Sequence, residues 1–298
     1  MIEATSRLSP QTLRNLNRLV FATAMLGLGL GVETTILHLT SDPLADVHAY
    51  YDAAVRLNGG QPLYPPGADP NLPGFYRYPP LLAILLRPFA SFPFEVFAAG
   101  WELLIVLAFG ATIYSLGLNR RTFMLASILA LPIAWSVIIG QAQVLVTLLL
   151  AVGAPWSVAL AGQLKLFPAL VGLYWLARGE WRSFGAFVAW TLIFLLAQFV
   201  LAPNSMLDFV RISNFGEVGN VRNISPYQIS PILWVVVVIV GFVGVVRLAP
   251  TRWGWTAAIA FSVFATPRLL VYMLGTLLAA LRPTDRSQNT SVIPPVGD

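Results

Sequence analysis

Apolar segments long enough to enter or cross a lipid bilayer follow one another along almost the whole chain. The composition agrees, because 57% of the 298 residues are hydrophobic and 10% are charged, with a mean hydropathy of +0.74. A soluble domain carries roughly 25% charged residues. Open backbone cannot face lipid, and the alternating ten-residue pattern of barrel strands is not seen in the sequence. We therefore expect an all-α integral membrane protein.

The apolar segments differ in length, and this predicts two kinds of helix. A helix needs about 20 apolar residues to cross a bilayer, and shorter pieces broken by Gly or Pro are typical of half-length or interfacial helices. We expect a multi-helix bundle of about ten transmembrane or half-length helices. Crossings are expected at 18–39 (uncleaved), 94–118, 122–139, 183–202 and 231–248, with shorter pieces at 81–92, 144–153, 156–164, 166–177, 253–266 and 269–281.

Two long polar loops, residues 40–80 and 203–230, interrupt a single membrane domain that we place at 1–281, with a polar cytoplasmic tail at 282–298. Arginines cluster at other turns, and the positive-inside rule puts such turns in the cytoplasm. The N-terminus is then cytoplasmic, and both loops lie outside an inner or plasma membrane. The net charge of +5 thus indicates orientation in the lipid, with no nucleic-acid partner. The basic turns carry Arg120, Arg121, Arg178, Arg182, Arg247, Arg252, Arg282 and Arg286.

Several chemistries have no support in the sequence. The chain has no cysteine and two histidines, which do not make a zinc site by themselves, and it has no glycine-rich phosphate-binding motif. We expect neither a metal nor a cofactor.

The first loop carries Asp42, Asp46, Asp52 and Asp69. Asp46, Tyr50 and Ala54 are spaced four apart and would share one face of a short helix. One interpretation is an amphipathic interfacial helix with a solvated acidic face. The other is a carboxylate at the membrane surface that acts as a general base.

Lys165 is the only lysine of the chain and separates two apolar half-helices. A charge at such a position indicates a functional site with an anionic partner, or a side chain that extends to a nearby interface. Gln141 and Gln143 lie in a polar break just before these short helices, and the three residues are candidates for substrate binding.

Arg268 follows Pro267 between two further short apolar pieces, with Tyr272 soon after it. A guanidinium suits a phosphate, although an exposed arginine in a helix-breaking loop would look the same in sequence. The crossing count places Lys165 and Arg268 on the side of the first loop. Weaker substrate-binding candidates in that loop are His48, Arg77 and Tyr78.

Read together, these segments resemble glycosyltransferase family 87, whose members are polyprenol-phosphate-mannose-dependent mannosyltransferases with a GT-C membrane fold. The resemblance covers most of the chain and depends on the order of the motifs more than on any single one. The motifs are D-x-x-x-Y-x-x-A from Asp46, G-x-P-L-Y ending at Tyr64, F-Y-R-Y-P-P at 75–80, G-Q-A-Q at 140–143, L-K-L-F-P at 164–168, R-G-E-W-R at 178–182 and P-R-L-L-V-Y at 267–272.

The resemblance implies transfer of a sugar, mannose in that family, from a polyprenyl-phosphate donor to an extracytoplasmic hydroxyl of a glycolipid or glycan. The aspartate that follows the first helix in the family corresponds to Asp46, which would be the general base of an inverting displacement. Lys165 and Arg268 would stabilise the departing lipid phosphate. A donor with one phosphate does not require a metal.

Two other classes of function remain open at this point. A non-catalytic subunit of a membrane complex could keep the same scaffold, and it would present apolar surface to partner chains. A transporter is less well supported, because transporters usually show internal repeats and none is evident in this sequence.

Overall fold

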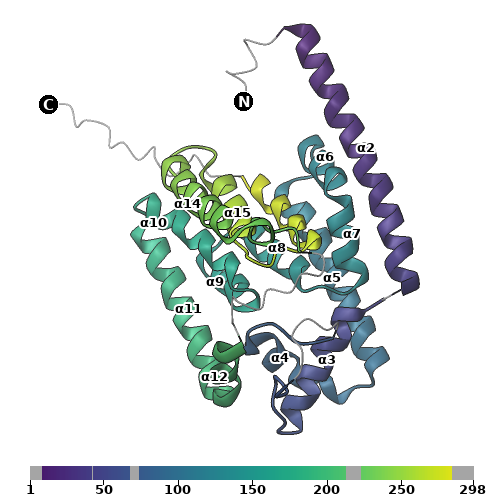
Figure 1. Ribbon diagram of the computed structural model, residues 1–298, viewed down its shortest axis with the longest axis vertical. Coiled ribbons are helices and arrows are strands. Elements are labelled where there is room, and N and C mark those ends of the chain that lie inside the picture. Colours follow the sequence, from purple (N-terminus) through teal and green to yellow (C-terminus); the bar gives the residue numbers. More distant parts are fainter. Residues whose placement is uncertain (1–8, 42, 68–73, 213–222, 284–298) are drawn as a thin grey trace, which may run out of the picture.

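The computed structural model describes residues 9–41, 43–67, 74–212 and 223–283. Within these ranges the regular structure is helical apart from an isolated bridge between Asn223 and Leu270. Long helices run along the outside of the molecule and short helices lie between them (Figure 1). The expected all-α membrane fold is thus confirmed.

Among the described residues, four helices are long and apolar enough to cross a membrane. Many of their large apolar side chains are exposed, as expected for surfaces that contact lipid. Each coincides with an expected crossing, although the first begins eight residues before the predicted 18. These helices are α2 (Pro10–Ser41), α5 (Phe94–Leu116), α11 (Trp181–Leu201) and α14 (Pro231–Leu248).

The crossing expected at 122–139 is not one straight helix. It consists of α6 (Arg120–Ile128) and α7 (Ala130–Ile138), which meet at an angle of 71°. Pro132 has no N–H to donate to the carbonyl of Ile128, so the helical ladder is interrupted there. Helix α2 packs on this break through Gly27, where a Cβ would come within 2.3 Å of the Ser127 carbonyl oxygen.

Shorter helices form the interior and pack against one another. Two of the short helices differ from the helices expected from the sequence. The piece expected at 166–177 is split in two, and the last apolar piece is a 3₁₀ helix. These elements are α8 (Gln143–Val152), α9 (Pro155–Leu164), η2 (Phe167–Gly172), α10 (Leu173–Ala177), α15 (Gly254–Phe264) and η4 (Val271–Leu281).

The two long loops contain helices of their own. In the first loop, α3 (Ala45–Asn58) is the short helix expected around Asp46, and the piece expected at 81–92 is divided into α4 (Pro80–Leu86) and η1 (Arg87–Ser91). The second loop contains α12 (Pro203–Ile212) and α13 (Pro226–Ile229). Asp42, Asp69 and residues 284–298 of the expected tail lie outside the described residues.

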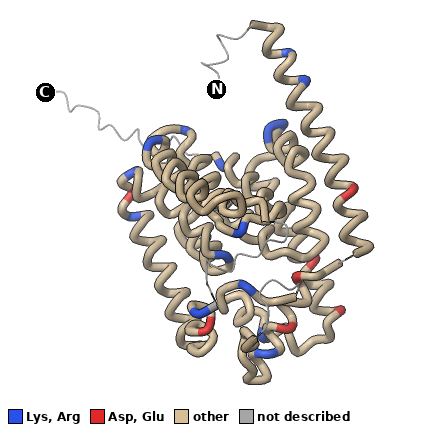
Figure 2. Tube along the Cα trace, in the orientation of Figure 1, with Lys and Arg blue, Asp and Glu red and all other residues tan. Residues whose placement is uncertain are grey.

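We use the name basic end for the end of the molecule where α6 begins and where α10 and α14 end (Figures 1 and 2). Arg120 begins α6, Arg178 follows α10, Arg252 lies in the turn after α14 and Arg282 follows η4. Arg178 Nη1 donates to the Ala249 carbonyl (3.1 Å), which joins the end of α10 to the end of α14. Arg282 Nε donates to the Val152 carbonyl (3.2 Å) at the end of α8. The short helices therefore run between this end and the opposite end, where α3 and α4 lie.

Candidate active site

Helix α3 is docked by its backbone onto the turn that follows α7. The Leu44 N–H donates to the Ile138 carbonyl (3.2 Å), and the Asp46 N–H donates to the Ile139 carbonyl (3.1 Å). Leu44 has a positive φ of 59°, which a residue with a Cβ adopts only when its surroundings hold it there. The start of α3, and with it Asp46, is therefore fixed relative to the membrane helices.

Gly140 makes this close approach feasible. Its φ is +68°, and an added Cβ would lie 2.1 Å from Val47 Cγ2 and 2.7 Å from Glu102 Oε1. Its carbonyl accepts a hydrogen bond from Trp101 Nε1 (2.7 Å). A residue with a side chain would be strained in its backbone and would also displace α3. The glycine of the G-Q-A-Q segment thus brings three helices together behind Asp46.

Gln141 is the centre of a buried hydrogen-bond network that holds the Asp46 carboxylate. Its side chain is fully buried, and Nε2 donates to Asp46 Oδ2 (2.7 Å). Its Oε1 accepts from the hydroxyls of Tyr50 (2.8 Å) and Tyr78 (2.9 Å). The Tyr50 hydroxyl in turn accepts from the Ala142 N–H (3.1 Å). This network fixes the orientation of the amide and presents the carboxylate of a half-buried Asp46 in one position.

Lys165 is the residue that follows α9, and its side chain points into the same region. It is 8% exposed, and its ammonium lies 4.8 Å from the centre of the Tyr272 ring and 5.1 Å from that of Tyr78. Its charge is within electrostatic reach of Asp46. Within the described part of the chain, Nζ is buried and has no hydrogen-bond partner. A desolvated ammonium without hydrogen bonds is costly, so this position is a candidate binding site for an anionic group of a substrate.

The depth of Lys165 follows from a second buried network. Gln198 Nε2 donates to Gln163 Oε1 (2.8 Å), and Gln198 Oε1 accepts from the Leu81 N–H (2.9 Å) at the start of α4. Gln198 lies three residues before the end of the span α11, and Gln163 lies two residues before Lys165. Lys165 is therefore buried in protein near the level at which α11 ends.

Two arginines complete the cationic side of the site. Arg77 and Arg268 are both half-buried, and each Nε is shielded from solvent. Burial lowers the pKa of the Arg77 guanidinium below its ordinary value, and the charge of Arg268 lowers it further. Arg77 also senses the charge of Asp46, and Arg268 lies within electrostatic reach of Tyr272. Two half-buried cations within electrostatic reach of each other favour the binding of an anion.

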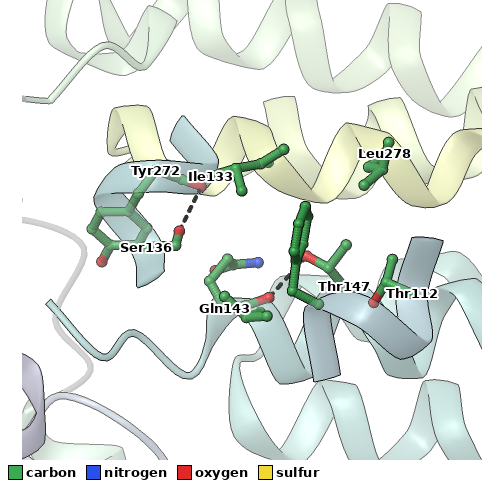
Figure 3. Close-up of a pocket in the computed structure, with 10 residues that line it drawn as sticks. Thr112, Ile133, Ser136, Gln143, Thr147, Tyr272 and Leu278 are labelled. Carbon is green, nitrogen blue, oxygen red and sulfur yellow. Dashed lines mark hydrogen bonds between the residues drawn. The ribbon is translucent and has the colours of Figure 1, made fainter. Parts of the chain in front are cut away.

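Two predicted site residues lie elsewhere. His48 is exposed, and its ring stacks on Phe94 with centroids 3.8 Å apart. Gln143 donates from Nε2 to the Thr276 hydroxyl and lines a small cavity between α5, α7, α8 and η4, which Tyr272 also lines (Figure 3). This cavity has a volume of about 20 Å³, which is room for about one water molecule. The structure therefore gathers Asp46, Gln141, Tyr78, Lys165, Tyr272, Arg77 and Arg268.

Three contributors were not predicted as site residues. Tyr50 was placed only on the face of α3 that carries Asp46, and the i, i+4 spacing was the signal for its role. The sequence signal for Gln163 and Gln198 was only that they are polar residues in apolar helices. Such a residue usually has a buried polar partner. Their contacts join segments 35 and 117 residues apart.

Taken together, these groups place one carboxylate opposite three cations at one end of a membrane-embedded helical bundle. A carboxylate can accept a proton, and the cations can hold an anionic group. The class defined by fold and site is thus a polytopic membrane protein with a candidate site for a charged ligand at one end of its helical bundle.

The chain belongs to glycosyltransferase family 87, whose sequence profile matches residues 75–281. A curated relative from Mycolicibacterium smegmatis, named polyprenol-phosphate-mannose-dependent alpha-(1-2)-phosphatidylinositol pentamannoside mannosyltransferase, is 34% identical over 158 residues. That match takes in 46% of this chain and 38% of the relative, so the chain covers well under two thirds of the relative's length. No solved structure matches significantly.

Proposed function

We propose that this protein transfers mannose from a polyprenyl-phosphate donor to a hydroxyl of a glycolipid or glycan acceptor. Family membership and the name of the M. smegmatis relative support the donor and the sugar. The observation that carries the proposal is Lys165, an ammonium buried beside Asp46 without a hydrogen bond among the described residues. A phosphate that arrives with the substrate would meet this unmet requirement.

In the proposed reaction Asp46 is the general base. The acceptor oxygen attacks the anomeric carbon, its proton passes to the Asp46 carboxylate, and the bond from that carbon to the phosphate oxygen breaks. Attack and departure on opposite faces invert the anomeric centre. Gln141 supports this role because its donated hydrogen bond at 2.7 Å orients the carboxylate and leaves further lone pairs for the proton.

The electron pair of the broken bond stays on the leaving polyprenyl phosphate, whose negative charge increases as it departs. Lys165, Arg268 and Arg77 would stabilise this charge where water is largely excluded, so their effect would be larger than at an exposed surface. Tyr78 and Tyr272 hold the Lys165 ammonium by their ring faces. Charge compensation by these three side chains makes a metal-independent reaction part of the proposal.

The proposed orientation puts the basic end in the cytoplasm and the site at the extracytoplasmic surface of a cell inner or plasma membrane. Arg178 and Arg282 bind backbone carbonyls where α14 and α8 end, and α10 and α14 end opposite α3 (Figure 1). These positions support the orientation, because basic residues are retained on the cytoplasmic side (compare Figure 2). A polyprenyl chain would then lie in the lipid, and its phosphate would reach Lys165 from the bilayer.

The test is transfer of labelled mannose from polyprenyl-phosphate-mannose by the purified full chain in nanodiscs, with mycobacterial phosphatidylinositol mannosides offered as acceptors. The proposal predicts a mannosylated product of inverted anomeric configuration and loss of transfer in Asp46→Asn. If the wild-type chain and the variant both bound polyprenyl phosphate and neither transferred mannose to any acceptor, the result would support a non-catalytic subunit of a membrane complex instead.

A further inference from the structure

The side chain of Asn223, from the second polar loop, bonds to the backbone on both sides of Arg268. Asn223 Nδ2 donates to the Pro267 carbonyl (3.1 Å), and Asn223 Oδ1 accepts from the Leu269 N–H (3.0 Å). These two backbone groups belong to the residues on either side of Arg268. The Ile224 N–H adds a hydrogen bond to the Leu269 carbonyl (2.8 Å). The backbone on both sides of Arg268 is therefore fixed by hydrogen bonds, and we call this set of contacts the clasp.

The clasp replaces hydrogen bonds that regular structure would otherwise supply. Residues 265–270 lie between α15 and η4, outside both helices, so their backbone groups need partners from other segments. Ser225 Oγ donates to the Thr266 carbonyl (2.9 Å), and Trp234 Nε1 donates to the Ala265 carbonyl (3.0 Å). The Ser225 N–H also donates to Asn223 Oδ1 (2.9 Å), which orients the Asn223 amide.

The restraint on this backbone matters because Arg268 is a half-buried cation. Its charge acts on Arg77, a second half-buried cation, and both face the region that holds Lys165 and Tyr272. On an unrestrained backbone a half-buried guanidinium can extend toward solvent and regain hydration. A clasped backbone limits that movement and so keeps the guanidinium ready for a phosphate.

We propose that Asn223 is a positioning residue, which fixes Arg268 for the donor phosphate and couples the second polar loop to the phosphate-binding side of the site. This role rests on the proposed function, because it assumes that Arg268 binds the phosphate of a polyprenyl donor. Asn223 itself touches backbone and not the reacting atoms. Its contribution therefore passes through Arg268 and disappears when that arginine is absent.

The experiment is a double-mutant cycle on the full chain in nanodiscs, with polyprenyl phosphate as the binding probe. Asn223→Ala is expected to weaken its binding about tenfold, and by less than about twofold in the Arg268→Ala background, because coupled residues are not additive. Hydrogen exchange of the peptide that contains Leu269 is measured alongside. It is expected to be faster in Asn223→Ala, because the Leu269 N–H loses its partner.

Asn119→Ala is the matched control. Asn119 also accepts through Oδ1 from two backbone N–H groups, those of Arg121 (2.9 Å) and Thr122 (3.2 Å), but at the basic end. It is expected to lower thermal stability comparably and to leave polyprenyl-phosphate affinity unchanged.

Three results would overturn the assignment. The first is unchanged affinity in Asn223→Ala, the second is an equal loss of affinity with and without Arg268, and the third is unchanged exchange at Leu269. Absence of polyprenyl-phosphate binding by the wild-type chain would overturn the proposed function and this role with it. Failure of the proposed function can be told apart from failure of the Asn223 role, because hydrogen exchange at Leu269 is measured without polyprenyl phosphate.

Discussion

The basic end and the site end hold their cations in different ways. At the basic end, Arg282 lies over the Trp255 ring (4.7 Å to its centre) and also donates to a carbonyl. Arg178 lies over Tyr174, donates to a carbonyl and forms an ion pair with Glu180. At the site end, Lys165 has two aromatic faces but no hydrogen bond within the described part of the chain.

This difference shows which end is built for a ligand. Cations that are satisfied within the protein stabilise a surface, whereas a buried cation without hydrogen bonds lowers stability and persists when function requires it. Aromatic contacts are common to both ends and do not distinguish them. Hydrogen bonding of the charged group does, and the predictions below are chosen to test that distinction.

The largest effect is expected for Asp46→Asn. The amide keeps the shape of the carboxylate but cannot take up the acceptor proton, and loss of a general base typically reduces turnover by about 10²–10⁴-fold. Initial rates of mannose transfer at saturating donor measure this effect, while polyprenyl-phosphate affinity should change little. Asp52→Asn, an exposed carboxylate on the same helix, serves as the control, and equal rates for the two variants would remove Asp46 from the mechanism.

Lys165→Met should separate function from stability. Loss of a charge-assisted contact of about 1.5–3 kcal/mol would weaken polyprenyl-phosphate binding roughly 10–100-fold. The same change should raise the melting temperature of the unliganded protein, because a desolvated ammonium is removed. Binding isotherms and thermal unfolding in nanodiscs measure the two effects.

Arg252→Met is the control at the other end, because Arg252 is an exposed cation that lies over Trp253 (5.3 Å to the ring centre). We expect it to change neither affinity nor stability appreciably. If Lys165→Met lowered stability as a conventional core substitution does, the contrast between the two ends would be lost.

Gly140→Ala should show how closely α3 is held against the membrane helices. The added Cβ meets Val47 at 2.1 Å in a backbone with positive φ, and we expect a loss of about 2–4 kcal/mol from strain and displacement. Gly179→Ala carries the same backbone penalty, since φ is +70°, but meets no atom within 4 Å. Thermal unfolding and transfer rates of the pair separate backbone strain from packing behind Asp46, and equal losses would argue against the close approach.

Smaller effects are expected from the two tyrosines that donate to Gln141. Tyr50→Phe leaves the buried Ala142 N–H without a partner and should cost about 1–3 kcal/mol, whereas Tyr78→Phe removes one donated bond and should cost about 0.5–1.5 kcal/mol. Unfolding and transfer rates measure both. A greater loss of stability for Tyr78→Phe would contradict the network as described.

The smallest effect is expected from removal of divalent cations. Since Lys165, Arg77 and Arg268 provide the charge compensation in this account, EDTA treatment followed by transfer assays should leave the rate within about twofold. A rate that collapsed with EDTA and returned with added Mg²⁺ would show that these side chains are insufficient.

The sequence predicted the membrane helices well, because apolar length and arginine position are local properties of the chain. It also selected Asp46, Lys165 and Arg268, which the structure places at the same end. It did not predict the break between α6 and α7, since an apolar run looks the same whether straight or bent. Pro132 was the signal that could have indicated it.

The supporting contacts were less accessible from sequence. Tyr50 to Gln141 joins residues 91 apart, and Asn223 to Leu269 joins residues 46 apart, so both depend on how the helices pack. His48 and Gln143 were expected in the site because of their residue type and their neighbours in sequence. The structure places both away from Asp46, because the first faces solvent and the second faces α5 and η4.

The central claim is that the site end, and not the basic end, receives the lipid phosphate. A cryo-electron microscopy map of the full chain in nanodiscs with bound polyprenyl phosphate tests it most directly. The account predicts phosphate density within hydrogen-bonding distance of Lys165 Nζ and on the same side as Arg268 and Arg77. Phosphate density on Arg178, Arg252 or Arg282, with Lys165 left unoccupied, would contradict it.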